Sequence, residues 1–339
     1  MNLQELGQTA HQIVADNRGI LAADESNNTI GKRFQALGIP STEDTRRAYR
    51  EMLFTTPGVE KFISGVIMYD ETIRQKTKAG VPFPELQSKL GIVPGIKVDK
   101  GVKPLPGSPK EKITEGLDGL GERLQEYHGL GARFAKWRAV IDIADGIPTE
   151  YCIRANAQAL ARYAALCQEA GLVPIVEPEV LMDGAHSLER CAEVTSVTLK
   201  TVFDELYIHR VALEGMLLKP NMVISGMKCA NQAGIEQVAR ETVRVLRRHV
   251  PAAVPGIVFL SGGQSAELAT AHLNAMNALG SYPWVLSYSY GRALQAPALA
   301  AWKGQETGLA AGQKALHHRA QCNSAACAAI YNPGMEKAA

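Results

Sequence analysis

Long uncharged apolar runs are missing from this sequence. A helix that crosses a bilayer needs roughly 18 consecutive apolar residues, and no stretch of the chain reaches that length. Residues 1–19 carry acidic and amide side chains where a secretory signal requires an unbroken apolar segment. We therefore expect a cytoplasmic protein with no membrane partner.

An excess of charge of one sign is also missing. The 339 residues include 36 basic and 34 acidic side chains, which gives a formal net charge of +2. Binding to nucleic acid or to an anionic membrane surface usually needs a broad positive field. We expect no nucleic-acid partner, and any basic site must be local.

Cysteine and histidine spacings typical of metal sites are absent as well. The six cysteines contain no Cys-x-x-Cys pair, which indicates scattered, reduced thiols. The eight histidines fall in segments with helix or loop character and not at strand ends. A catalytic metal would need a cluster of such ligands, so we expect neither a metal nor a cofactor.

No fixed short repeat is visible, which argues against a solenoid. Instead, strand-like runs alternate with longer helix-like segments, the pattern of a parallel sheet with helical crossovers. Helix patterns cover, for example, residues 149–170 and 234–250. Eight runs have strand character: residues 19–24, 62–69, 91–99, 134–141, 172–180, 213–223, 256–263 and 284–290. This count predicts an α/β fold, a (β/α)8 TIM barrel, which takes about 250 residues and leaves the rest for terminal helical extensions.

The domain organisation follows from this count. We assign residues 1–303 to the barrel domain, including an N-terminal helix, and residues 304–339 to a C-terminal helical extension with a mobile tail. Residues 97–112, KVDKGVKPLPGSPKEK, are rich in lysine, proline and glycine. We expect a mobile, solvated loop there, whose lysines are mostly surface residues and partly a source of positive potential beside an anionic substrate.

Charged residues stand late in five of the predicted strands. Active sites of such barrels lie at the carboxyl ends of the strands, and inward side chains recur at every second residue. A single charge at a strand end is more often structural than catalytic, but charges at equivalent positions in successive strands predict a shared site. These residues are Asp24, Lys97, Lys136, Arg138, Glu177, Glu179 and Lys219.

Lys219 follows the apolar run GMLL. A lysine amine attacks a carbonyl only in its neutral form, which apolar surroundings and a neighbouring cation such as Lys136 both favour. Lys219 is therefore the candidate for a Schiff base. The carboxylates of Asp24, Glu177 and Glu179 are candidates for moving protons during carbinolamine loss and carbon–carbon bond cleavage.

Two glycine-containing segments lead from strands into helices. FLSGGQS follows the seventh predicted strand and SYSYGRALQ follows the eighth, and loops at these positions of a TIM barrel commonly hold phosphate. Glycine lets backbone N–H groups approach an anion at a helix N-terminus, and the planar guanidinium of Arg292 suits phosphate oxygens. The two segments together predict a phosphate site.

Seven segments, GILAADES, KVDKG, AKWRAV, IVEPEV, LLKPNMV, LSGGQS and SYGRALQ, occur in this order. In order and spacing they closely resemble the class I fructose-bisphosphate aldolases, over roughly residues 19–302. The resemblance implies a lyase of glycolysis and gluconeogenesis that reversibly cleaves fructose 1,6-bisphosphate into dihydroxyacetone phosphate and glyceraldehyde 3-phosphate. It also implies a homo-oligomer, a tetramer or a dimer.

The resemblance also implies residue roles. Lys219 would form the Schiff base, Glu177 would act as acid and base with Glu179 close by, and Asp24 would orient the attacked hydroxyl. Lys136 would be the second active-site lysine. The implied substrate-binding residues are Arg138, then Ser261, Gly262, Gly291 and Arg292 for the phosphate of the ketone half, and Ser26, Thr29 and Lys97 for the other phosphate.

The chain departs from the family at its C-terminus. The segment YNPGMEKAA lacks the final tyrosine of the animal enzymes, and the last tyrosine is Tyr331, so a catalytic role of the tail stays open. Two alternatives to the aldolase remain. Another Schiff-base barrel aldolase would share the lysine without needing two phosphate sites, and a non-catalytic sugar-phosphate-binding protein would not need a nucleophilic lysine.

Overall fold

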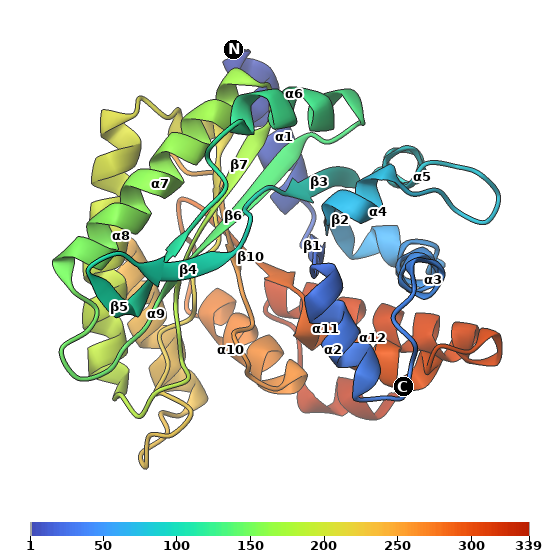
Figure 1. The fold of residues 1–339 in the computed structure, drawn as a ribbon. Helices are drawn as coiled ribbons and strands as arrows, with labels where there is room; N and C mark the ends of the chain where they lie inside the picture. The colour runs from blue at the N-terminus through green and yellow to red at the C-terminus, as the bar shows by residue number, and fades with distance from the viewer. Residues whose placement is uncertain (1, 339) are drawn as a thin grey trace.

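A computed structural model describes residues 2–338, and within them eight parallel strands close into a barrel surrounded by helices (Figure 1). The order around the barrel is β1-β10-β9-β8-β7-β6-β3-β2. The strands are β1 Gly19–Ala23, β2 Ile63–Met68, β3 Val93–Lys97, β6 Phe134–Ile141, β7 Val173–Val180, β8 Leu217–Leu218, β9 Gly256–Phe259 and β10 Val285–Tyr290. The predicted TIM barrel is confirmed, and each strand lies inside a predicted run.

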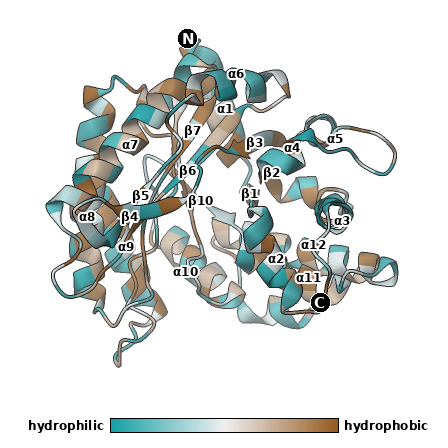
Figure 2. Cartoon of the chain, in the orientation of Figure 1, coloured by the Kyte–Doolittle hydropathy of each residue, from teal (hydrophilic) through white to brown (hydrophobic). Residues whose placement is uncertain are grey.

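Helices cover the outside of the barrel, with α7, α8 and α9 on one side and α2, α11 and α12 on another (Figure 1). Hydrophilic and hydrophobic residues alternate along α7 and α8, as expected of helices with one buried face (Figure 2). Among residues 2–338, no helix is long and apolar enough to cross a membrane. The helices are α1 Leu3–Val14, α2 Asn27–Gln35, α3 Glu43–Phe54, α4 Asp70–Arg74, α5 Phe83–Lys89, α6 Leu120–Gly129, α7 Glu150–Glu169, α8 Leu188–Ile208, α9 Ile235–His249, α10 Ala266–Ala278, α11 Arg292–Trp302 and α12 Leu309–Cys327, with short 3-10 turns η1 Val59–Lys61, η2 Leu213–Gly215, η3 Glu306–Gly308 and η4 Pro333–Ala338.

The helix predictions for residues 149–170 and 234–250 are confirmed by α7 and α9. Thr149 caps α7, since its hydroxyl accepts a hydrogen bond from the Cys152 backbone N–H at 3.1 Å. Gly171, at φ +77°, ends the turn after α7 in a left-handed conformation that glycine adopts without strain. Both boundaries are thus set by local chemistry that the sequence displays.

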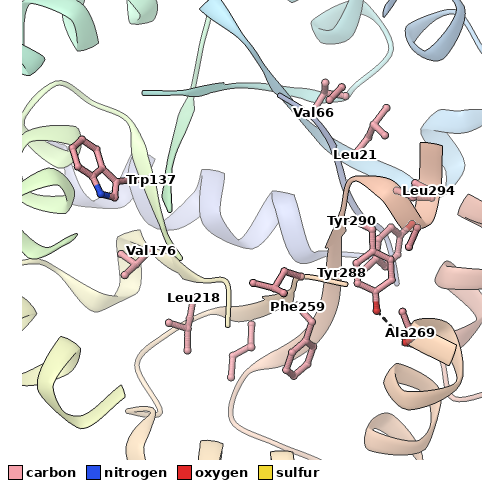
Figure 3. Packing of buried hydrophobic residues seen from close by; sticks show 14 of the residues in the cluster. Leu21, Val66, Trp137, Val176, Leu218, Phe259, Ala269, Tyr288, Tyr290 and Leu294 are labelled. Atoms are coloured by element: carbon pink, nitrogen blue, oxygen red, sulfur yellow. Dashed lines mark hydrogen bonds between the residues drawn. The ribbon is translucent and has the colours of Figure 1, made fainter. Parts of the chain in front are cut away.

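Outward-facing strand side chains form the layer between the barrel and its helices. Trp137 of β6 packs against Tyr163 of α7, with ring centroids 5.6 Å apart and the rings tilted, and the hydroxyl of Tyr290 donates to the Ala269 carbonyl at 3.1 Å. Burial of such large side chains contributes most of the stability of a domain of this size. Figure 3 shows part of this layer, including Leu21, Val66, Trp137, Val176, Leu218 and Phe259.

Helix α1 closes the amino end of the barrel. Its apolar face consists of Leu6, Ala10, Ile13 and Val14, all buried. These side chains cluster with inward-facing residues near the strand starts: Ile20, Val93, Phe134, Val173, Leu217 and Val258. A Cβ added at Gly256, the first residue of β9, would lie 2.6 Å from Val14 Cγ1, so glycine permits this close approach. The amino half of the interior is therefore apolar and filled.

The loop expected at residues 97–112 is instead largely an antiparallel hairpin of β4 Val102–Leu105 and β5 Ser108–Thr114. Its turn contains Gly107 at φ +78°. The Thr114 hydroxyl donates to the Arg138 carbonyl at 2.7 Å, and Glu111 accepts from the Thr149 backbone N–H at 2.7 Å. The hairpin is thus attached to β6 and to the start of α7, while Lys103 and Lys110 are exposed as expected.

Helix α12 packs against α3, α10, α11 and β10, so the C-terminal extension contacts the barrel layer directly. In the part of the chain that the structure describes, all six cysteines are free thiols, and five are buried. Tyr331 is also buried, and its hydroxyl donates to Glu336 Oε1 at 2.8 Å.

Candidate active site

The inward-facing side chains change from apolar to charged along each strand. In β6, Phe134 belongs to the apolar layer above α1, and Lys136 follows two residues later. In β7, Ile175 is succeeded by Glu177 in the same way, and Leu217 of β8 is succeeded by Lys219, the residue directly after that strand. Because successive inward positions are two residues apart, the charges gather at the carboxyl end.

These charges line one cavity of about 670 Å³ at that end of the barrel. All of the site residues predicted from the sequence are brought together there: Asp24, Ser26, Thr29, Lys97, Lys136, Arg138, Glu177, Glu179, Lys219, Ser261, Gly262, Gly291 and Arg292. Tyr331 is not among the residues that line it. The cavity size is typical of small-molecule sites.

Lys136 is the centre of a buried ion-pair network. Its Nζ lies 2.7 Å from Asp24 Oδ2, 3.5 Å from Glu177 Oε2 and 3.9 Å from Asp99 Oδ2. Burial by itself would lower the pKa of Lys136, but the charges of the three carboxylates outweigh burial and raise this pKa well above its usual range. Lys136 therefore stays charged at neutral pH.

Asp24 shows the complementary effect. Burial would raise the pKa of its carboxyl, yet the nearby ammonium groups of Lys136, Lys219 and Lys97, in that order of influence, hold the pKa well below its usual range. Asp24 is consequently a carboxylate at any physiological pH. It is suited to accept hydrogen bonds and is a weak acceptor of a whole proton.

Lys219, directly after β8, contacts the same network. Its Nζ lies 3.2 Å from Glu177 Oε1, and both side chains are about 95% buried. The preceding inward-facing residue, Leu217, is fully buried in the apolar layer beneath it. The Lys219 backbone N–H donates to the Val176 carbonyl at 2.8 Å, which fixes the lysine relative to β7. The amine is thus positioned beside a carboxylate on an apolar support.

Glu179 is paired differently from Glu177. Its carboxylate forms an ion pair with the Arg138 guanidinium. Burial raises the pKa of Glu179, and the charge of Arg138 offsets this effect only in part. The two glutamates of β7 therefore have different environments, a common basis for dividing acid and base roles.

Two helix N-termini and a glycine turn border the cavity. Ser26 caps α2, accepting from the Thr29 backbone N–H at 3.4 Å, and Gly291 precedes α11, which begins at Arg292. After β9, Gly262 has φ +55°, and an added Cβ would lie 1.9 Å from Met182 Cε, so a side chain at this position would displace the methionine. Such N-termini and glycine turns present N–H groups to anions.

Asp99 is a cavity residue that the sequence interpretation missed. Its Oδ1 lies 2.8 Å from Lys97 Nζ, and its Oδ2 faces Lys136, so it bridges two cations. The sequence could have indicated Asp99, because it follows Lys97 by two residues. The two side chains share one face if the strand pattern continues. Its role as a bridge could not be predicted in this way, because the second cation, Lys136, belongs to the neighbouring strand β6.

Arg33 and Glu25 are further cavity residues without a prior assignment. Arg33 Nη1 lies 2.5 Å from Glu25 Oε1, and the buried Arg50 lies 2.8 Å from Glu25 Oε2. Arg33 follows Thr29 by one helical turn on α2, which was a usable signal. The remaining residues that line the cavity are Ala22, Gly101, Val102, Lys112, Val140, Leu181, Asp183, Met227, Leu260, Gly263 and Ser289.

Histidine and cysteine do not occur among the described residues that line the cavity. His272 illustrates where the histidines lie instead: it belongs to α10, is buried, and has its pKa lowered to about 4 by that burial. The histidine cluster that a zinc-dependent aldolase would need is therefore not formed there by these residues.

Comparisons with known proteins agree with this geometry. The family described as fructose-bisphosphate aldolase class-I matches residues 5–339. The chain is 58% identical over 327 residues to a probable fructose-bisphosphate aldolase class 1 of Xanthomonas axonopodis pv. citri, covering 96% of this chain and 98% of that protein. It is 55% identical over 325 residues to the fructose-bisphosphate aldolase of Dictyostelium discoideum, covering 95% and 91%. The fructose-bisphosphate aldolase of Plasmodium falciparum, solved with TRAP and a small-molecule inhibitor, superimposes with a TM-score of 0.97 at 51% identity, covering 98% and 96%.

Proposed function

Because the chain belongs to the class-I fructose-bisphosphate aldolase family, we propose which of its cavity residues perform each step of the aldolase reaction. The enzyme is a lyase that cleaves fructose 1,6-bisphosphate reversibly into dihydroxyacetone phosphate and glyceraldehyde 3-phosphate, in glycolysis and gluconeogenesis. The class-I reaction proceeds through a Schiff base, so the first assignment concerns the amine.

Lys219 is the Schiff-base residue in this proposal, and its contact with Glu177 is the observation that carries it. The amine must lose a proton before it attacks the substrate ketone, and Glu177 Oε1 lies 3.2 Å from Lys219 Nζ to accept that proton. The same carboxyl can then return a proton to the hydroxyl that leaves the carbinolamine as water. The resulting iminium draws electrons from the carbon–carbon bond that breaks.

Asp24 and Lys136 act on the substrate hydroxyl group whose proton is lost during cleavage. Asp24 is held as a carboxylate by the ion pair at 2.7 Å, so it orients this hydroxyl through a hydrogen bond. Because so acidic a carboxyl is a poor final acceptor, the proton passes to Glu177 or Glu179. Lys136 stabilises negative charge on the reacting oxygen.

The phosphate groups are assigned to the edges of the cavity. Ser261, Gly262, Gly291 and Arg292 bind the phosphate of the ketone half, because a glycine turn, a helix N-terminus and a guanidinium are suited to phosphate oxygens. Ser26, Thr29 and Lys97 bind the other phosphate at the start of α2. Arg138 contributes substrate contacts from β6.

Reductive trapping tests the central assignment. Borohydride reduces an iminium to a secondary amine that cannot hydrolyse, so dihydroxyacetone phosphate with borohydride should inactivate the enzyme and label the peptide that contains Lys219. Lys219→Arg should remain unlabelled. Labelling of Lys136, or equal labelling of the Lys219→Arg variant, would remove Lys219 from this role.

Assembly and location extend the proposal. A homo-oligomer, a tetramer or a dimer, is supported by apolar side chains at the surface of α8, where Tyr207 is 84% and Ile208 66% exposed. Light scattering with Tyr207→Glu and Ile208→Glu tests whether this face contributes. A cytoplasmic location is supported by an Arabidopsis thaliana relative described as cytosolic, 53% identical over 323 residues. Residues 304–339 are proposed to form an extension of the barrel domain.

A further inference from the structure

A cluster of three different metal-ligating side chains lies outside the active-site cavity, between α12 and the C-terminal turn η4. Its members are His318, Cys322 and Glu336, and one ligand atom from each lies within 4.8 Å of the other two. His318 and Cys322 are one helical turn apart on α12, so they share a face. Glu336 comes from residues 333–338, which turn back toward that face.

The spacing of these atoms fits tetrahedral coordination. Cys322 Sγ lies 3.7 Å from His318 Nε2, which lies 3.4 Å from Glu336 Oε2. Zinc bonds of about 2.3 Å to sulfur and about 2.0–2.2 Å to nitrogen and oxygen place tetrahedral ligand atoms roughly 3.3–3.6 Å apart. A cation could therefore be coordinated with shifts of only a few tenths of an ångström.

The surroundings have the features of a built site. Cys322 is fully buried, whereas the His318 and Glu336 side chains are 15% and 21% exposed. This difference leaves a route for an ion from solvent. The Tyr331 hydroxyl donates to Glu336 Oε1 at 2.8 Å, and Arg319 Nη1 lies 2.5 Å from Glu336 Oε2. Outer hydrogen bonds of this kind orient ligating carboxylates.

Arg319 shows how the charge of a bound cation would be accommodated. While Nη1 lies against Glu336 Oε2, the other amino group of its guanidinium, Nη2, donates to the Ala266 carbonyl at 3.2 Å and to the Thr270 hydroxyl at 2.7 Å. It can therefore keep contacts when a cation shares Glu336. Binding of a divalent cation replaces the Cys322 thiol proton, which leaves to solvent. The cation then carries a thiolate, a neutral imidazole and a carboxylate as ligands.

We propose that His318, Cys322 and Glu336 bind a divalent transition-metal cation of the zinc type, and that this ion fastens the C-terminal segment to α12. The thiolate and imidazole favour such an ion over magnesium or calcium, which prefer oxygen ligands. Two ligands come from the helix and the third from the tail. The ion therefore has a structural role, separate from the chemistry at Lys219.

Cobalt binding tests the site directly. Metal-free full-length enzyme is titrated with Co²⁺, and we expect a saturable near-ultraviolet thiolate-to-cobalt absorption, one ion per chain, that Zn²⁺ abolishes. Cys322→Ser should lose the absorption, and Glu336→Gln should weaken binding at least ~10-fold, the lower end for loss of even an outer-shell partner. Cys229→Ser removes a partly exposed thiol elsewhere and serves as the matched control.

A second measurement follows the tail. Hydrogen exchange at residues 331–337 should slow in Zn²⁺ for the wild type and for Cys229→Ser, but not for Cys322→Ser or His318→Gln. Circular dichroism checks that each variant is folded, and His318→Gln replaces Cys322→Ser if the latter is not. The proposal is overturned if the wild type shows no thiolate-to-cobalt absorption or if Cys322→Ser shows full absorption. It is also overturned if Zn²⁺ does not change the rate of hydrogen exchange at residues 331–337 in the wild type.

Discussion

Lys219 Nζ lies 3.2 Å from Glu177 Oε1, while the other oxygen of the same carboxylate lies 3.5 Å from Lys136 Nζ. One anion thus stands between two buried cations. A proton leaving Lys219 has an acceptor in direct contact, and the oxygen of that acceptor that faces Lys136 stays close to a positive charge, which favours the later return of the proton. This arrangement couples the nucleophile to the group that later handles the proton.

Replacing Glu177 by glutamine should therefore impair chemistry far more than binding. The amide has nearly the same shape but cannot accept the proton, and general acid–base catalysis contributes about 10²–10⁴-fold. We expect kcat for fructose 1,6-bisphosphate cleavage to fall by this factor, with KM changed only a few-fold. Borohydride labelling of Lys219 should also slow. Glu189→Gln, on the exposed start of α8, is the control, and an unchanged kcat in Glu177→Gln would contradict the assignment.

Asp24 should make stability depend on pH in the acid range. Its folded-state pKa is lowered below the ordinary value of about 3.9, so its contribution to stability is fully present above that value. The contribution is lost as the pH falls toward the folded-state pKa. Asp24→Asn should thus reduce the free energy of unfolding by up to about 3–5 kcal/mol at pH 7, the cost of breaking a buried pair.

Urea unfolding of the wild type and Asp24→Asn at pH 7, 5 and 3 measures this effect. We expect the difference between the two proteins to be constant from pH 7 to 5 and to shrink at pH 3. A difference that grows on acidification would mean that the Asp24–Lys136 pair does not lower the Asp24 pKa.

Gly262→Ala should weaken the ketone-side phosphate site. The added Cβ would lie 1.9 Å from Met182 Cε, so the turn after β9 or the methionine must shift. Gly263→Ala is the matched control, because its φ of +88° imposes similar backbone strain while its nearest neighbour, Met227 Sδ, is 3.6 Å away. Binding of dihydroxyacetone phosphate, measured by calorimetry, should weaken more in Gly262→Ala, and equal affinities would place the phosphate elsewhere.

Deletion of residues 331–339 tests the tail in catalysis. In the proposed mechanism, the dihydroxyacetone phosphate half stays on Lys219 as an enamine after cleavage and must gain a proton at carbon. Tyr331 does not line the cavity, so the tail can take part only by moving over the cavity mouth, as lid segments that control late steps do. We expect the deletion to slow solvent proton exchange into bound dihydroxyacetone phosphate and to leave borohydride trapping nearly intact. Exchange at the wild-type rate would assign the proton delivery to a residue within the barrel.

The barrel and its charged residues could be predicted because both follow local rules. Each strand is a short apolar run, and the inward charges follow apolar inward residues at intervals of two, as Ile175 and Glu177 do in β7. The hairpin at β4 and β5 could not be found in this way. Three of the four residues of β4 are exposed, so no apolar alternation marks the strand, and the prolines and lysines of the hairpin are typical of a loop.

The site residues that the sequence interpretation missed depend on contacts between segments far apart in the chain. Asp99 becomes a bridge only because β3 and β6 are neighbours with Lys97 opposite Lys136. Glu25 is held by Arg50 from α3 and by Gln295 Nε2 from α11 at 2.8 Å, across a separation of 270 residues in the latter case. Such partners cannot be identified from spacing along the chain.

Helix α1 limits the paths by which reactants can enter and leave the barrel. Its side chains and the apolar layer above them fill the amino half of the barrel, so, for residues 2–338, the cavity has no passage through the floor. Substrate and both products must share one entrance. In the proposed mechanism, glyceraldehyde 3-phosphate has no covalent bond to the protein and can depart while the other fragment is still attached to Lys219. Under this proposal the covalent bond sets the order of release through the single entrance, and in the reverse direction the ketone must be loaded before the aldehyde.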